Sequence, residues 1–148
     1  MTKKRTQHYK QLENMYQAAP LHAFYKGIQL KVEEKKSTVT LAIRPEYFHA
    51  GMSTHGSVYF KLLDDSAYFA CQSEIDDFFI VTTNFNISLL HPITKGTIKA
   101  VGTVDFSSKN LFTASAQLFD ERGRLCGTGQ GQFMKSRVAL DGVEGYLK

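Results

Sequence analysis

The chain has 148 residues, of which 43% are hydrophobic, and a formal net charge of +4. This length suits one domain with a core of ordinary size, so we expect a single domain over residues 1–148. The modest and scattered positive charge suits an anionic small molecule and does not require nucleic acid as a partner. No run approaches the roughly 18 consecutive apolar residues of a membrane span, so we expect no membrane partner.

Cysteine usage indicates a reducing compartment. Cys71 and Cys126 are the only cysteines, and neither belongs to a CxxC pair. The N-terminal segment carries positive charge but lacks the apolar stretch of a signal peptide. We therefore expect a cytoplasmic protein with free thiols.

The first predicted elements are a helix and a hairpin. Residues 7–18 place apolar side chains at spacings of three and four and stop before Pro20, which predicts a short amphipathic helix within an N-terminal cap over residues 1–20. Residues 27–43 alternate apolar and polar side chains on both sides of a charged turn, which is typical of a β-hairpin.

A long apolar helix and four further strands follow. The helix is predicted over residues 54–71, THGSVYFKLLDDSAYFAC, and the strands are predicted over 78–90, 97–106, 111–119 and 125–134. Turn signals between these strands favour sequential antiparallel pairing. A helix that is apolar nearly all round must be buried, so we predict an α+β fold whose core, residues 21–137, is a sheet of about six strands wrapped around this helix.

The buried helix carries two adjacent acids, which the helical period separates. At about 100° per residue, Asp65 lies in a polar stripe one turn from Lys61, which predicts an exposed ion pair of small energetic value. Asp64 lies at the edge of that stripe and borders the core. A carboxylate in such a place either bonds a neighbouring polar group or is a candidate for chemistry.

The start of the same helix predicts a site for negative charge. Ser53 or Thr54 can cap the first turn, which leaves the backbone N–H groups around His55, Gly56 and Ser57 open to a ligand. Such amides stabilise the oxyanion that forms when a carbonyl is attacked. His55 itself is expected to be a capping or core histidine rather than a proton-transfer group.

Because Asp64 stands two turns from these amides, it can reach the same carbonyl only from a neighbouring helix or after a suitable turn of the ligand. This spacing hints at a site shared between subunits. Pairing two sheets edge to edge would also remove an exposed edge from each, so we expect a homodimer or a dimer of dimers.

Two segments together resemble the hotdog-fold acyl-CoA thioesterases, in the branch that includes the phenylacetyl-CoA-type, PaaI-like enzymes. They are HGS at 55–57 with LD at 63–64, and TTNFNISLLHP at 82–92. The resemblance covers roughly residues 21–137. It departs from the usual pattern at Ser57, where the second glycine of HGG is expected, and at His49, which matches an upstream Asn.

The resemblance implies roles for particular residues. Asp64 would act as nucleophile or as general base on water, the Gly56 amide would polarise the thioester carbonyl, and Thr82, with Thr83 as its rival, would orient the water. His49 and Thr83, together with His55 and Ser57, are assigned to substrate binding. The five histidines lack HxxxH or HxH spacing, so no metal site or other cofactor is predicted.

We therefore predict an acyl-CoA thioesterase that releases a free acid and CoA. Two alternatives stay open: a non-catalytic acyl-CoA sensor, and a hotdog dehydratase or hydratase, although the HFPxxP-like stretch of the latter is missing. The acyl group, and whether CoA or a carrier protein bears it, are not predicted.

Overall fold

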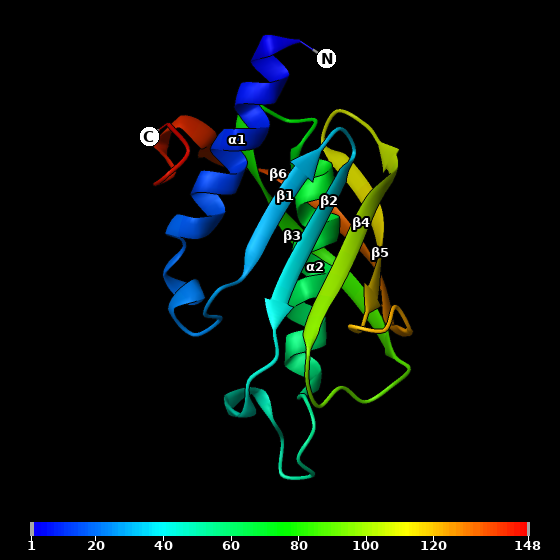
Figure 1. Ribbon diagram of the computed structural model, residues 1–148. Coiled ribbons are helices and arrows are strands. Elements are labelled where there is room, and N and C mark those ends of the chain that lie inside the picture. The colour runs from blue at the N-terminus through cyan, green and yellow to red at the C-terminus, as the bar shows by residue number, and fades with distance from the viewer. Residues whose placement is uncertain (1, 148) are drawn as a thin grey trace.

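The computed structural model describes residues 2–147, which form one sheet, two α-helices and three short 3₁₀ helices (Figure 1). In chain order the elements are α1 (Lys3–Ala18), η1 (Pro20–Ala23), β1 (Gln29–Glu33), β2 (Lys36–Ala42), η2 (Pro45–Tyr47), α2 (Gly56–Gln72), β3 (Phe78–Leu89), β4 (Thr97–Ser107), β5 (Leu111–Phe119), β6 (Leu125–Ala139) and η3 (Leu140–Gly142). Each predicted helix and strand is therefore present, with α1 longer at its start and β6 longer at its end.

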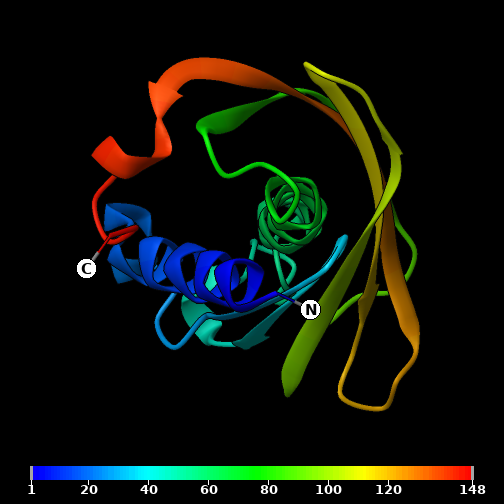
Figure 2. The ribbon, with the colours of Figure 1, turned by 90° about the horizontal axis from the view of Figure 1, so that it is seen from above.

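The sheet curls around α2, as the view from above shows (Figure 2). All five strand pairings are antiparallel, and the order across the sheet is β1-β2-β4-β5-β6-β3. A six-stranded antiparallel sheet wrapped around one long helix, with a shorter helix before it, is the hotdog fold. This confirms the predicted fold class.

The expectation of sequential pairing is wrong for β3. This strand does not pair with β4, which follows it in the chain; it pairs with β6, and β4 pairs with β2 instead. The turn signal after β3 marks the end of a strand but does not fix where the chain goes next. Residues 90–96 carry the chain across to the other side of the sheet, which leaves β3 at an edge.

The helix α2 lies unusually close to the sheet at Gly102. A Cβ at Gly102 of β4 would lie 2.2 Å from the backbone carbonyl of Ser66 in α2, so only glycine allows this approach. The Ser66 carbonyl also accepts a hydrogen bond from the Ser37 hydroxyl at 2.7 Å. These contacts fix the height of α2 over the sheet.

The helix α1 covers the outer edge of β1. The Glu13 carboxylate accepts a hydrogen bond from the Val32 amide at 3.0 Å, and the Gln17 side chain donates to the Ile28 carbonyl at 2.9 Å. The other edge of the sheet, β3, is not covered in this way within residues 2–147. It exposes Phe78, Val81 and Leu89.

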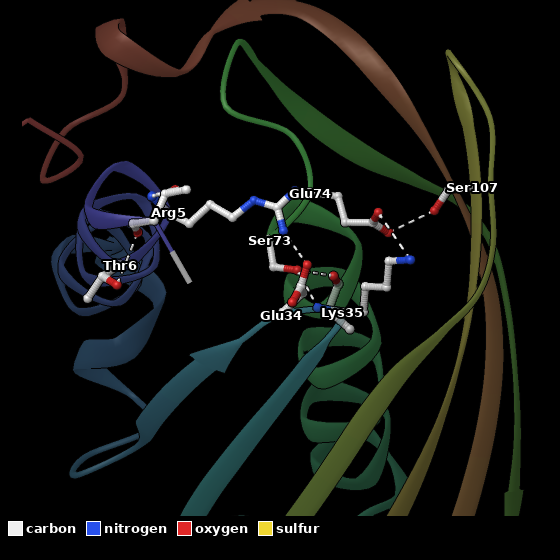
Figure 3. Close-up of polar contacts among 9 residues, drawn as sticks. Arg5, Thr6, Glu34, Lys35, Ser73, Glu74 and Ser107 are labelled. Atoms are coloured by element: carbon white, nitrogen blue, oxygen red, sulfur yellow. Dashed lines mark hydrogen bonds and ion pairs between the residues drawn. The ribbon is translucent and has the colours of Figure 1, made fainter.

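A polar network at the β1–β2 turn joins α1, the end of α2 and β4 (Figure 3). Arg5 forms an ion pair with Glu34, and the Lys35 amide donates to the Ser73 hydroxyl at 2.9 Å. Glu74 accepts a hydrogen bond from Ser107 at 2.8 Å. The network therefore anchors the start of α1 to the body of the fold.

Cys71 and Cys126 are both unpaired and buried. Among the described residues, no helix is long and apolar enough to span a membrane.

Candidate functional site

Asp64 is half-buried on α2 and faces β3. Its Oδ1 accepts a hydrogen bond from the Thr82 hydroxyl at 3.0 Å, and no ion pair to it occurs within residues 2–147. Burial, followed by the negative charge of Asp65, raises the pKa of Asp64 to about 6, against the opposing effects of Thr82 and Lys61. A carboxyl group with this pKa is ionised at neutral pH yet remains a better base than an ordinary aspartate.

Replacing Thr82 by Val is expected to raise the pKa of Asp64, because the hydroxyl stabilises the ionised form. If ionised Asp64 is the base, the acid limb of kcat/KM against pH should have its inflection near 6 in the wild type and at higher pH in the variant. The matched control is Thr83→Val, since the Thr83 hydroxyl donates to the Gln132 carbonyl at 3.2 Å instead. An inflection that Thr82→Val leaves in place would contradict this assignment.

The prediction that the Lys61–Asp65 ion pair is exposed is wrong. Lys61 Nζ lies 2.7 Å from Asp65 Oδ2, and the side chains of Lys61 and Asp65 are only 11% and 14% exposed. The reason is α1, which packs over this side of α2 and brings the Tyr16 hydroxyl to 2.6 Å from the Asp65 carboxylate. Periodicity along α2 alone does not show which polar side chains a second helix will cover.

His22 completes this cluster. Lys61 has only donors, so His22 Nε2, at 2.9 Å from Lys61 Nζ, must accept, and the ring proton lies on Nδ1, 2.5 Å from the Tyr16 carbonyl. Burial and the charge of Lys61 lower the pKa of His22. His22 is therefore neutral, and Asp65 is neutralised by Lys61, so Asp64 is the carboxylate left without a cation of its own.

A cavity of about 470 Å³ opens beside Asp64 and Thr82. Its other walls come from α1, η1, the start of β3, the C-terminal segment and the next turn of α2, and they are mainly apolar, with Tyr68 and Phe69 of α2 and Phe79 of β3 among them. We call this the Asp64 cavity. A mainly apolar cavity with carboxylates at its wall, Asp64 beside Thr82 and Glu144 on the C-terminal segment, has the form of a site for an apolar ligand with one reactive group.

The start of α2 differs from the prediction. Neither Ser53 nor Thr54 caps the helix; His55 does, since its Nδ1 accepts a hydrogen bond from the Ser57 amide at 3.0 Å. The His55 amide donates to the Tyr47 carbonyl at 2.8 Å. Of the three amides expected to be open, only that of Gly56 has no acceptor within residues 2–147. The capping role expected for His55 is confirmed.

Gly56 lies at a second cavity, of about 260 Å³, which we call the Gly56 cavity. His49 lines it and is held by the Gly51 amide at 2.9 Å and the Ser53 hydroxyl at 3.0 Å. Leu89 and Leu90, at the end of β3, form another wall. An open helix N-terminal amide at a cavity can bind an oxyanion.

The predicted site residues thus fall into two groups. Asp64 and Thr82 meet at one cavity, and Gly56 and His49 line the other. His55 and Ser57 hydrogen-bond to each other beside the Gly56 cavity, whereas Thr83 points away from Asp64. Gly56 and Asp64 are eight positions apart on the helix, which is about 12 Å along its axis. Within one chain the two groups therefore cannot contact the same carbonyl.

Sequence reasoning missed Tyr16 and His22, which line the Asp64 cavity. Tyr16 comes from α1 and His22 from η1, and the only signal in the sequence is that Tyr16 lies on the apolar face of the first helix. Nothing in the local sequence points His22 toward α2.

Comparisons with known proteins show the family of the chain. The chain belongs to the thioesterase superfamily, whose family model matches residues 52–127, just over half of the chain. The matched segment contains both Gly56 and Asp64. No curated protein sequence matches the chain.

Solved structures share the fold at low sequence identity. The PaaI protein of E. coli, from its phenylacetic acid degradation operon, superposes with a TM-score of 0.78 and is 20% identical, covering 89% of this chain and 97% of its own. A conserved protein of Pseudomonas aeruginosa has a TM-score of 0.74 at 21% identity, covering 80% of this chain and 94% of its own. A thioesterase of Haemophilus influenzae has a TM-score of 0.72 at 18% identity, covering 82% of this chain and 85% of its own.

Proposed function

We propose that the protein is an acyl-CoA thioesterase that hydrolyses the thioester to a free acid and CoA. The observation that carries the proposal is Asp64: a half-buried carboxylate with a raised pKa, held by Thr82 at the wall of an apolar cavity, in a chain of the thioesterase superfamily. No metal ion or other cofactor takes part in the proposed reaction.

In the proposed mechanism Asp64 acts as a general base. Its carboxylate takes a proton from water while the water oxygen bonds to the thioester carbonyl carbon. The negative charge that develops on the carbonyl oxygen is stabilised by the Gly56 amide. When the tetrahedral intermediate collapses, the carbon–sulfur bond breaks, and the thiolate of CoA leaves and takes up the proton.

Gly56 and Asp64 would have to come from different subunits. The strand β3 runs from the Asp64 cavity, which Val81 lines, to the Gly56 cavity, which Leu89 lines. If the free edges of two β3 strands pair antiparallel about a two-fold axis centred near Phe85, Val81 of one chain lies opposite Leu89 of the other. Such pairing brings the Asp64 cavity of one subunit next to the Gly56 cavity of its partner.

This arrangement also explains the exposed apolar side chains of β3. A long edge strand with unpaired amides and apolar side chains is a liability unless another strand covers it. A homodimer, or a dimer of such dimers, covers it and completes two sites at once.

The direct test of the activity is release of CoA. Incubation with a panel of acyl-CoAs and a thiol-reactive dye should show free thiol only if the thioester bond is broken. A sensor would bind acyl-CoA without releasing thiol, and a dehydratase or hydratase would change the acyl chain and leave the thioester intact. Either result would overturn the proposal.

Mixing two inactive variants tests the shared site. Asp64→Asn removes the base, and Gly56→Val places side-chain atoms where a Cβ alone would already lie 3.0 Å from Leu89 Cδ1. In a mixed dimer, one site combines the intact Asp64 of one chain with the intact Gly56 of the other. If equal amounts of the two variants exchange subunits at random, half of the dimers are mixed. Each mixed dimer has one intact site of its two, so about a quarter of wild-type activity should return.

In the control, each variant is taken through the same mixing procedure alone at the same total concentration, and it should stay inactive. If the mixed sample also stays inactive while size-exclusion chromatography of differently tagged chains shows that mixed dimers have formed, the shared site is wrong.

A further inference from the structure

The loop that leads from η2 into α2 lines one side of the Gly56 cavity and carries His49 and Ser53. Figure 1 shows this loop extending beyond the start of α2. It closes on itself through two backbone hydrogen bonds, from the His49 amide to the Ser53 carbonyl at 3.0 Å and from the Met52 amide to the His49 carbonyl at 2.9 Å. The loop therefore has a defined shape next to Gly56.

Two positions show that this loop is built closely around the His49 ring. Met52 adopts a φ of 64°, a left-handed conformation that a residue with a side chain rarely adopts. A Cβ at Gly51 would lie 2.8 Å from His49 Cε1 and 3.0 Å from His49 Nδ1, so glycine lets the chain turn close to the ring. The position of the ring is therefore set by the backbone of its own loop.

The hydrogen bonds of His49 determine its tautomer. The Gly51 amide donates to Nδ1 at 2.9 Å, so Nδ1 carries no proton, and the proton of the neutral ring lies on Nε2. Nε2 lies 3.0 Å from Ser53 Oγ and therefore donates to it. Because the Ser53 oxygen accepts this hydrogen bond, the hydroxyl keeps its own proton to donate. No acceptor for that proton occurs within residues 2–147.

The two other hydroxyl groups at the Gly56 cavity are already engaged. The Thr54 hydroxyl donates to the Ile93 carbonyl at 2.7 Å, and the Tyr59 hydroxyl donates to the His91 carbonyl at 2.6 Å. Both therefore hold the protein together and have no proton left for a ligand. Within residues 2–147, Ser53 carries the hydroxyl of this cavity that is free to donate.

We propose that the Ser53 hydroxyl is a second donor to the oxyanion, beside the Gly56 amide, and that His49 positions it. The proposal rests on the proposed function, because it places the thioester carbonyl oxygen in the Gly56 cavity. That oxygen gains charge as water attacks, and a donor that is already aimed at it needs no reorganisation. His49 is then a positioning residue that acts through Ser53, whereas the resemblance assigned it to substrate binding.

Removing the hydroxyl by Ser53→Ala should lower kcat and kcat/KM for acyl-CoA hydrolysis equally, by about 10². KM should change little, because the contact strengthens only as the oxyanion forms. Ser53→Thr keeps a hydroxyl and should keep most of the activity. Ser108→Ala is the control for the substitution itself, since the Ser108 hydroxyl donates to the Leu111 carbonyl of its own turn at 2.9 Å, and its kinetics should match the wild type.

The positioning role of His49 is tested in two backgrounds. His49→Ala alone should lower kcat by about tenfold, because the hydroxyl is present but no longer held in place. In the Ser53→Ala background the same substitution should cause no further loss. An equal loss in both backgrounds would show that His49 contacts the substrate itself, and would overturn the positioning role. Circular dichroism checks that each variant is folded.

The ring of His91 also lines the Gly56 cavity and is the rival donor. If His91→Ala lowers kcat as expected for Ser53→Ala, while Ser53→Ala matches the wild type, the assignment of Ser53 is overturned.

Binding of two CoA thioethers, measured by calorimetry, separates this proposal from the proposed hydrolysis. Trifluoroacetonyl-CoA has a ketone that adds water to become tetrahedral, and 3,3,3-trifluoropropyl-CoA has the same skeleton without the ketone oxygen. Ser53→Ala should weaken binding of the ketone by about tenfold or more and leave that of its partner within about twofold.

The outcomes for the two proposals are distinct. If Ser53→Ala weakens binding of the ketone alone but the wild type releases no CoA from thioesters, the hydrolysis is overturned and the second donor is supported. If the wild type hydrolyses acyl-CoAs but Ser53→Ala changes neither kcat nor binding of the ketone, the second donor is overturned and the hydrolysis stands. A wild type that releases no CoA and binds both thioethers equally overturns both.

Discussion

Replacing Asp64 by Asn is expected to lower kcat for acyl-CoA hydrolysis by about 10² to 10⁴, the usual contribution of a positioned general base. The amide cannot take a proton from water, but its oxygen can still accept the hydrogen bond from Thr82. Folding should survive, and the melting temperature should stay the same or rise, because the variant no longer buries a charge with one hydrogen-bond partner. Turnover and thermal unfolding of the purified variant measure both effects.

The matched control is Asp65→Asn, which removes the neighbouring carboxylate on the same helix. Asp65 is bound by Lys61 and Tyr16, so its loss should lower the free energy of unfolding by roughly 1 to 3 kcal/mol rather than remove the base. It should also move the acid limb of kcat/KM to lower pH, because the charge of Asp65 raises the pKa of Asp64. If Asp65→Asn is inactive and Asp64→Asn is active, the assignment of the base is wrong.

The effect of Asp65→Asn illustrates what the sequence could and could not predict. The period of α2 correctly placed Asp64 at the border of the core and Asp65 beside Lys61. That period describes one helix only, however, and the burial of the Lys61–Asp65 pair depends on α1, which is distant in sequence. From the sequence, this ion pair was predicted to be exposed and of small energetic value. Because it is buried, we now expect the pair to contribute to the stability of the fold, and the Asp65 charge to raise the pKa of Asp64.

The same limit applies to the sheet and to the helix start. Alternation of apolar residues identified the hairpin and β5, and turn signals on both sides bounded the other strands. These signals do not show which strands pair with one another, so the position of β3 at the edge of the sheet was missed. At the helix start, His55 caps α2 although Ser53 and Thr54 are the commoner capping types. Capping preferences rank the residue types that could cap the helix, but the path of the chain from Tyr47 to Gly56 decides which residue does so.

The packing of the C-terminal segment against α1 could not be predicted, because it depends on contacts between the two ends of the chain. His8 and Tyr146 are 138 positions apart in sequence, and the hydrogen bond between them has no local signal. By contrast, Asp64 and Thr82 are 18 positions apart in a helix and the strand after it, and their meeting was expected from the resemblance to hotdog thioesterases.

Replacing Gly102 by Ala is expected to have the largest effect on stability. The added Cβ would lie 2.2 Å from the Ser66 carbonyl carbon and oxygen and 2.5 Å from the Ala67 nitrogen, all backbone atoms of α2 that no side-chain rotation can move. The helix or β4 must shift, so we expect a loss of about 3 kcal/mol or more and a melting temperature lower by about 10 °C. Thermal and urea-induced unfolding measure this loss.

The control for Gly102→Ala is Gly142→Ala, where a Cβ would have no atom within 4 Å, and its melting temperature should match the wild type. Because Ser66 lies two residues beyond Asp64, a displaced α2 would also carry the base away from Thr82. Gly102→Ala should therefore lose turnover even at temperatures at which circular dichroism shows that it is folded. A variant that melts like the wild type would show that α2 does not depend on this close approach for its position over the sheet.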